Sequence, residues 1–238
     1  MTSPEYTIQG RTVSIPVEVR HATSWFATFA VPLDAATSLI EYSGLTPVAP
    51  IPGRALCSLA FVDYTDGDLD PYHEVAVAIL VGEPGTTGRK PAGAFIHQLP
   101  VDQSFTCEAG RTMWGFPKFV ADIRIDPGRH GAARAILSHD GDHILTLRIR
   151  GGLPLPSRGT ALDAFSHRDG VLRRTRWSLA GTGSRMRPGG ATVQLGDHPI
   201  AQELRGLGFP RHALMSGSLT NVRMEFAAAE VVGDRSEG

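Results

Sequence analysis

Short runs of strand-forming residues dominate this sequence and constrain its fold more than any other feature. Residues 75–81 (Val-Ala-Val-Ala-Ile-Leu-Val) are a continuous apolar run, which is typical of a strand buried on both faces. Apolar and polar residues alternate over 121–125 and over 145–150, which is the pattern of half-buried strands. An Asp-Gly pair within 139–142 predicts a tight hairpin. The pattern therefore favours a fold built mainly from strands.

Helical signals are fewer. Three stretches predict short helices, each with a polar residue placed to cap it: 32–40 with Asp34, 103–113 with Ser104, and 199–207 with Asp197. Of these, 103–113 is the most ambiguous. No internal repeat, low-complexity tract or linker is evident over residues 1–238, so we expect one α+β, barrel-like domain.

Charge and hydropathy limit the classes of function. The formal net charge is −1, which argues against nucleic-acid or membrane-surface binding. No apolar run approaches the roughly 18 residues of a membrane-spanning helix, and the first residues lack the layout of a secretion signal. Two cysteines, Cys57 and Cys107, give no disulfide framework and favour a reducing compartment. We therefore expect a cytoplasmic protein.

Two clusters of polar residues have ordinary interpretations that we favour. Six arginines lie between residues 168 and 187 and could hold an anionic ligand or a partner subunit, but such runs are more often solvated, glycine-bounded loops. Residues 139–143 (His-Asp-Gly-Asp-His) have metal-binding side chains, yet hairpin turns use the same residues and no third group of ligands accompanies them. We therefore expect no metal.

Lysine is rare in this chain. Among 23 basic residues, only Lys90 and Lys118 are lysines. Because a guanidinium stays protonated and an amine need not, a retained lysine is a candidate for chemistry that requires a removable proton. Lys90 lies in a polar Gly-Arg-Lys-Pro-Ala-Gly segment, where a surface position is the simpler interpretation.

Lys118 lies in a different setting, the aromatic segment Trp-Gly-Phe-Pro-Lys-Phe at 114–119. Pro117 fixes its own backbone and extends the preceding residue, so the lysine leaves a defined corner and then enters the strand predicted at 121–125. Aromatic neighbours would remove the amine from water and favour its neutral form, which is the form that attacks a carbonyl. From the residues alone, a lysine with its stem on apolar surface and its head in water is the stronger interpretation.

A family resemblance reverses that preference. Residues 110–119 resemble the active-site region of the acetoacetate decarboxylase superfamily, in which a Gly-Arg pair precedes a helix end and an aromatic-Pro-Lys turn. Residues 72–74 (Tyr-His-Glu) look like the Tyr-x-Glu element of that family, and 193–198 and 214–232 are similar as well. The resemblance covers roughly residues 15–232. It implies a closed, cone-like antiparallel β-barrel with surrounding strands and a few short helices.

The resemblance also implies a function: a cofactor-independent lyase in which Lys118 forms a Schiff base with a keto acid. Glu74 would be the acid/base, although an isolated glutamate before a strand is otherwise a solvated turn residue. We expect five further residues around the substrate: Arg111, which carries over from the family, and Trp114, Phe116, Phe119 and Cys57. Of these, Arg111 would bind a substrate carboxylate or brace Glu74. We also expect a homo-oligomer.

Three positions depart from the family's pattern. True decarboxylases carry two successive lysines at this turn, where this chain has Phe119 after Lys118. A strand glutamate of the family falls near Cys57, and an N-terminal arginine falls near residues 21–22. These losses leave three alternatives: a decarboxylase, an aldolase- or dehydratase-type Schiff-base enzyme for a longer and less charged keto substrate, or a non-catalytic binding protein on the same barrel.

Overall fold

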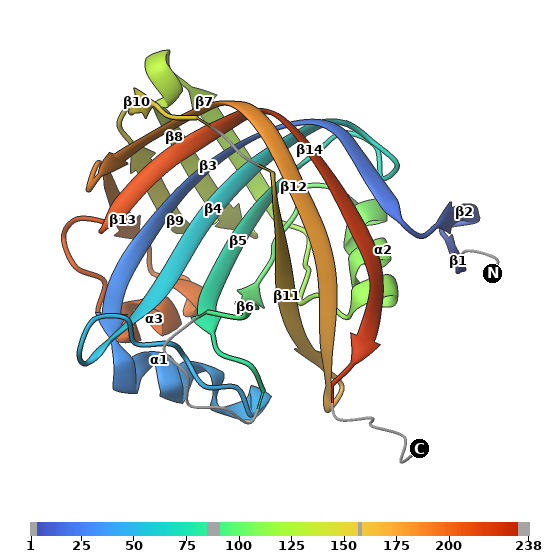
Figure 1. Cartoon of the computed structure of the whole chain (residues 1–238), viewed down its shortest axis with the longest axis horizontal. Coiled ribbons are helices and arrows are strands. Elements are labelled where there is room, and N and C mark those ends of the chain that lie inside the picture. Colours follow the sequence, from blue (N-terminus) through green and yellow to red (C-terminus); the bar gives the residue numbers. More distant parts are fainter. Residues whose placement is uncertain (1–3, 85–90, 157–158, 233–238) are drawn as a thin grey trace.

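The structure, a computed structural model, describes residues 4–84, 91–156 and 159–232, and long twisted strands dominate it (Figure 1). The strands are β1 (Glu5–Ile8), β2 (Arg11–Ser14), β3 (Val17–Pro32), β4 (Arg54–Gly67), β5 (Tyr72–Val81), β6 (Gly93–Gln98), β7 (Asp122–Pro127), β8 (Ala133–His139), β9 (Asp142–Ile149), β10 (Leu153–Pro154), β11 (Thr160–Arg168), β12 (Val171–Pro188), β13 (Ala191–Leu195) and β14 (Met215–Val231). The helices are α1 (Leu33–Ile40), α2 (Ser104–Trp114) and α3 (Pro199–Gly206), with 3-10 turns η1 (Glu41–Ser43) and η2 (Arg129–Gly131).

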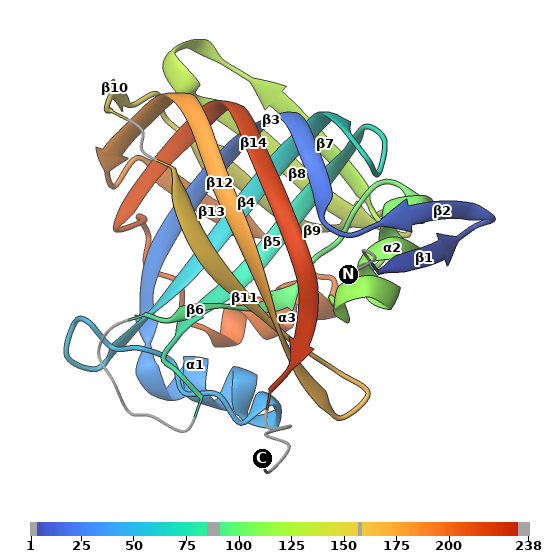
Figure 2. The ribbon, with the colours of Figure 1, turned by 45° about the vertical axis from the view of Figure 1, so that its right-hand side comes forward.

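Seven of the described strands close into a barrel. Neighbours follow the order β12-β11-β6-β5-β4-β3-β14, and β14 pairs again with β12, which completes the ring. Figure 2 shows these strands running obliquely around the barrel, with the β1–β2 hairpin projecting beside α2. The expected β-rich fold with a closed barrel and a few short helices is confirmed. One pairing, between β6 and β11, is parallel, whereas the other barrel pairings are antiparallel.

The strands of one barrel wall separate the main hydrophobic core from the barrel interior. On β4, Cys57 and Phe61 are buried in that core, whereas Ala60 and Val62 face the interior. A second sheet, in the order β13-β9-β8-β7, supplies the other half of the core through residues such as Leu147. Because both faces of β4 and β5 meet apolar neighbours, the continuous apolar run at 75–81 is explained.

The helices occur where the sequence predicted them, but the predicted capping residues are wrong. The observed N-caps are Pro32, Gln103 and His198, in place of Asp34, Ser104 and Asp197. In α2, the side chain of Gln103 accepts the N–H of Thr106 at 2.6 Å, so an amide replaces the expected hydroxyl. In α3, the imidazole of His198 accepts the N–H of Ile200 at 3.2 Å. Pro199 occupies the first turn of α3, where its missing N–H costs no helical hydrogen bond.

The arginine-rich run is a strand, so the predicted glycine-bounded loop is wrong. Arg168 ends β11, and the other five arginines lie on β12. Pairing of β12 with both β11 and β14 satisfies its backbone along most of its length. The arginine side chains hold neighbouring segments: Arg174 pairs with Asp163, and Arg185 donates to the carbonyl oxygen of Gly152 at 3.1 Å.

The strand that follows Lys118 does not belong to the barrel. β7 begins at Asp122 and belongs to the four-stranded sheet, so Lys118 lies in the loop between α2 and β7 and not at the start of a barrel strand. The two residues before β7 pair only through isolated contacts, because Val120 forms a single bridge with Val101. Lys90 lies outside the described residues.

The predicted hairpin at 139–142 is confirmed. Asp140 and Gly141 adopt positive φ between β8 and β9, which is the geometry that an Asp-Gly pair favours in a two-residue turn. In the described part of the chain, no group of three or more His, Cys, Asp or Glu side chains comes together as metal ligands would. None of the described helices is long and apolar enough to cross a membrane.

Candidate active site

Lys118 and Glu74 form an ion pair inside the barrel. Lys118 Nζ lies 2.7 Å from Glu74 Oε2, and the two side chains are only 3% and 10% exposed. Glu74 lies on β5, so the interpretation of this residue as a solvated turn residue is wrong. The two candidate catalytic side chains are therefore in direct contact and shielded from water.

A short extended segment between β6 and α2 ties these two residues together. Val101 forms an antiparallel bridge with Glu74 on one side. On its other side, Val101 donates its N–H to the carbonyl oxygen of Phe119 at 2.9 Å and accepts the N–H of Ala121 at 2.8 Å. The loop that carries Lys118 is thus attached, through one intervening residue, to the start of β5.

α2 provides the surface on which the Lys118 side chain lies. Thr106 and Gly110 are four residues apart and so share one face of the helix. Lys118 Nζ donates to Thr106 Oγ1 at 3.2 Å. A Cβ atom at Gly110 would lie 2.5 Å from Lys118 Cδ and 2.6 Å from Cε, so the lysine stem occupies the space that the glycine leaves empty.

Two stacked tyrosines complete the surroundings of the pair. Tyr64 donates its hydroxyl to Glu74 Oε1 at 3.0 Å. Tyr72 stacks on Tyr64 with ring centroids 4.3 Å apart, and its own centroid lies 5.1 Å from Lys118 Nζ. Burial raises the pKa of both phenols well above the usual range, so both stay protonated at neutral pH. One oxygen of Glu74 therefore accepts from a phenol and the other from the ammonium.

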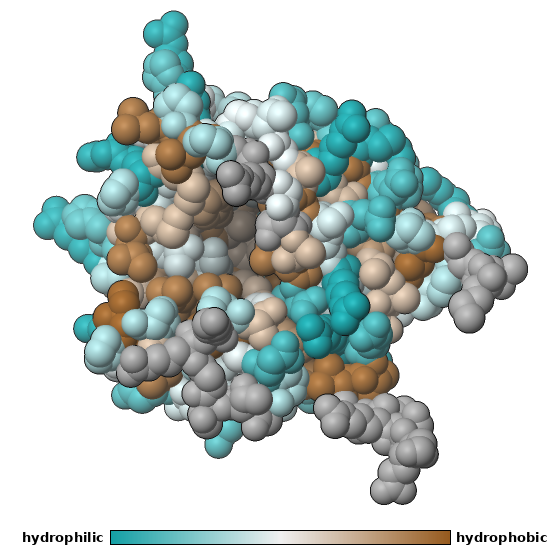
Figure 3. Space-filling model, in the orientation of Figure 1, coloured by the Kyte–Doolittle hydropathy of each residue, from teal (hydrophilic) through white to brown (hydrophobic). Residues whose placement is uncertain are grey.

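The ion pair lies on the wall of a cavity of about 470 Å³ inside the barrel. Trp114 and Phe116 line this cavity beside Lys118. Most of the remaining lining comes from inward-facing apolar residues of the barrel strands. The space-filling view shows a hollow in the front of the molecule, surrounded mainly by apolar residues (Figure 3). Among the described residues that line the cavity, Lys118 is the only cation.

The sequence model of the acetoacetate decarboxylase (ADC) family matches residues 5–235, nearly the whole chain. The chain belongs to the acetoacetate decarboxylase family. The suspected resemblance is thereby confirmed. Among curated proteins, no sequence matches this chain.

Three solved structures illustrate proteins that share the fold of this chain. Acetoacetate decarboxylase from Legionella pneumophila is 16% identical, with a TM-score of 0.70 over 93% of this chain and 89% of that chain. The enduracididine biosynthesis enzyme MppR in complex with pyruvate is 16% identical, with a TM-score of 0.63 over 99% and 93%. An acetoacetate decarboxylase-like enzyme from Sphingomonas wittichii RW1 is 17% identical, with a TM-score of 0.59 over 95% and 97%.

Three of the residues expected around the substrate lie outside the cavity of this family member. Cys57 faces the core, and burial raises the pKa of its thiol to about 12. Phe119 packs edge-on against His139, with centroids 5.4 Å apart. Arg111 is exposed and donates its Nε–H to the carbonyl oxygen of Lys118 at 2.6 Å, so it holds the loop rather than contacting Glu74.

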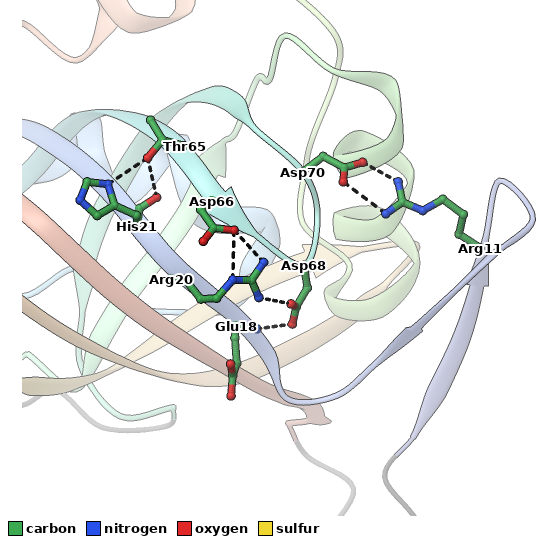
Figure 4. Close-up of polar contacts among 8 residues, drawn as sticks. All are labelled: Arg11, Glu18, Arg20, His21, Thr65, Asp66, Asp68 and Asp70. Atoms are coloured by element: carbon green, nitrogen blue, oxygen red, sulfur yellow. Dashed lines mark hydrogen bonds and ion pairs between the residues drawn. The ribbon is translucent and has the colours of Figure 1, made fainter.

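Arginines beside the cavity pair with three carboxylates at its edge, Asp66, Asp68 and Asp70 (Figure 4). Arg20 on β3 donates to Asp66 at 3.0 Å and to Asp68 at 2.6 Å. Arg11 on β2 pairs with Asp70. These arginines hold the pKa of Asp66 and of Asp70 below the usual range. The edge therefore carries ionised carboxylates, and negative charge remains in excess there because Arg20 faces two of them.

Sequence reasoning did not mark Tyr64, Thr106 or Gly110 as site residues. One signal could have identified the last two: a glycine inside a predicted helix, four residues after a threonine and shortly before the lysine. No local signal marks Tyr64, because its role depends on the pairing of β4 with β5, which places Tyr64 across from Tyr72.

His73, beside Glu74 in the sequence, forms a separate ion pair near the surface. Its Nδ1 lies 2.6 Å from Asp102 Oδ2, and this hydrogen bond raises the pKa of His73. A raised folded-state pKa stabilises the fold fully below the unfolded pKa of about 6.5, and this contribution is lost as the pH rises through the folded value. We expect His73→Gln to lower the free energy of unfolding more at about pH 5.5 than at about pH 9.

Chemical denaturation at both pH values measures this difference. The exposed His212 offers a matched control, since His212→Gln should change the free energy of unfolding little at either pH. An effect of His73→Gln that is equal at both pH values would contradict the stabilising role of the His73–Asp102 pair.

Proposed function

We propose that this protein is an enzyme that forms a Schiff base between Lys118 and a keto substrate. The observation that carries the proposal is the buried contact of Lys118 with Glu74 on the wall of an apolar cavity. Glu74 would act as the base that takes a proton from the ammonium, since its Oε2 lies 2.7 Å from Lys118 Nζ. The neutral amine that remains is a nucleophile for carbonyl carbon.

In the proposed reaction, the nitrogen of Lys118 adds to the keto carbon, and the keto oxygen leaves as water after taking up two protons. The product is an imine that, once protonated, withdraws electrons from the neighbouring carbon. The bond from that carbon to a carboxylate, a carbon or a hydrogen then breaks, and its electron pair forms an enamine. Glu74 would return a proton to the enamine carbon, and water would release the product and restore Lys118.

Relatives with known ligands support a keto acid as the substrate class. MppR has been solved with pyruvate and with the condensation product of pyruvate and imidazole 4-carboxaldehyde. Both decarboxylation and aldol-type condensation proceed through the same imine. A decarboxylase-type lyase and an aldolase- or dehydratase-type enzyme are therefore both compatible with the pair of Lys118 and Glu74.

One observation favours the aldolase or dehydratase type. Among the described residues lining the cavity, Lys118 is the only cation, and the arginines beside its edge, Arg11 and Arg20, already pair with carboxylates. A small keto acid would therefore find no second positive group for its carboxylate, and an apolar cavity imposes a desolvation cost on that charge. We expect weak or no release of CO₂ from acetoacetate.

Borohydride reduction in the presence of a panel of 2- and 3-keto acids tests the proposal. We expect a mass increase on the peptide that contains Lys118 and none on the peptide that contains Lys90. Parallel measurement of CO₂ release separates decarboxylation from the other outcomes. The absence of any adduct across a broad panel, or labelling of Lys90 instead, would overturn the Schiff-base function.

A further inference from the structure

We propose that the part of the cavity away from Lys118 is a subsite for a long, unbranched apolar tail of the carbonyl substrate, an inference that rests on the function proposed above. Glu74, Ala76, Ala78 and Leu80 alternate along β5, and all four line the cavity. At about 3.3 Å per residue, this wall is about 20 Å long. The cavity thus extends well beyond the space that a four-carbon keto acid occupies beside Lys118.

Small side chains keep this space open along one wall. Ala76 pairs across the sheet with Ala60, and Ala78 pairs with Ser58 on β4 and with Ile96 on β6. All five side chains point into the barrel and line the cavity. Four of the five side chains are alanine or serine and extend little from the sheet. The wall therefore leaves room along the two neighbouring pairs Ala60–Ala76 and Ser58–Ala78.

The opposite wall is aromatic and aliphatic. Trp177 on β12 stacks on Phe226 of β14 with ring centroids 5.6 Å apart and planes 4° apart, and Leu179 and Met224 line the same wall. Contact with such surfaces is favourable for methylene groups and offers little to charged ones. Each methylene that becomes fully buried is expected to strengthen binding about fourfold.

The charges at the edge of the cavity explain why an apolar tail fits better than a charged one. Asp66 and Asp68 share the single guanidinium of Arg20, so negative charge is in excess there, and Asp163 pairs with Arg174. An anionic tail would meet these carboxylates, and a cationic tail would have to leave water along walls formed by side chains such as Ala60, Ala78 and Trp177, which are apolar. An apolar tail needs no charged partner, because its transfer out of water is favourable by itself.

The test compares butanone, 2-octanone and 2-dodecanone as trapping partners of Lys118. In the wild type, the concentration that gives half-maximal borohydride-trapped adduct should fall as the chain lengthens. Ala78 lies about 13 Å along β5 from Glu74. Ala78→Phe should therefore leave the half-maximal concentration of butanone within about twofold of the wild type and raise that of 2-dodecanone by about tenfold or more. Ala180→Phe, at an exposed position on β12, is the matched control and should change neither value.

Two further measurements keep the outcome clear if Ala78→Phe destabilises the barrel. Leu80→Ala enlarges the same subsite and should leave the butanone value unchanged while favouring 2-dodecanone. In Lys118→Arg, 2-dodecanone should still quench tryptophan fluorescence, because Trp177 lines the tail subsite and this subsite does not require an imine. Adducts that form equally with short and long ketones, unaffected by either variant, would overturn the subsite and leave the Schiff-base function standing. Tail binding without any adduct would instead overturn the Schiff-base function.

Discussion

Replacing Lys118 by arginine is expected to abolish adduct trapping and to lower turnover of any substrate found for the wild type by about a thousandfold or more. A guanidinium keeps the positive charge opposite Glu74 but cannot supply a neutral amine. Because the buried carboxylate keeps a partner, the free energy of unfolding should change little. Turnover and adduct formation are measured alongside thermal unfolding. An arginine variant that remains active would exclude Lys118 as the nucleophile.

Lys118→Met separates chemistry from stability. Methionine keeps an unbranched apolar stem but leaves Glu74 buried without a counter-ion, with Tyr64 still donating to it, and loss of a buried counter-ion typically costs about 3–5 kcal/mol of unfolding free energy. Adding Glu74→Gln to Lys118→Met should recover much of that loss, because a neutral amide needs no counter-ion. If the double variant is no more stable than Lys118→Met, the ion pair is not what makes the single change destabilising.

Gly110→Ala is expected to reduce adduct formation at Lys118 by about a hundredfold, because displacement of a reacting group by about 1 Å can cost this much. The added methyl group would lie 2.5 Å from Lys118 Cδ, and the stem must move away from the face of α2. Alanine is the better helix former by about 1 kcal/mol, which offsets part of the strain. The expected signature is therefore a large loss of reactivity with a small change in stability.

Gly206→Ala is the matched control for this change. Gly206 is the last residue of α3, and no heavy atom outside its own helical surroundings lies within 4 Å of a Cβ built there. Adduct formation should be unaffected. If Gly110→Ala reacts as fast as Gly206→Ala, the space beside Gly110 does not set the position of the amine.

Local sequence patterns identified the elements well and their partners poorly. The run at 75–81 and the alternation at 145–150 both proved to be strands. Such strands can be predicted because successive side chains of a strand point to opposite faces, so the pattern is contained in residues adjacent in the sequence. The run between 168 and 187 was wrongly interpreted as a loop. Its arginines lie on a strand whose stability comes from β11 and β14, and nothing within the run indicates those partners.

The residues expected around the substrate show the same limit. Cys57 and Ala60 lie on opposite faces of β4, and both faces meet apolar neighbours, so alternation does not indicate which face lines the cavity. Phe119 follows Lys118 directly in the sequence, yet the turn of the chain directs its ring toward the core between the sheets. Trp114 and Phe116 do line the cavity, and their contact with substrate stays a prediction.

The sequence by itself determined that this chain is rich in strands, that short helices begin near residues 33, 104 and 199, and that Lys118 leaves a proline-fixed corner among aromatic residues. Each of these depends on residues close together in the chain. Only the tertiary structure decided that Glu74 meets Lys118, that Tyr64 holds the far oxygen of Glu74, and that Gly110 leaves room for the lysine stem. Those contacts join residues from β4, β5 and α2, and they exist because closure of the barrel brings these elements to one place.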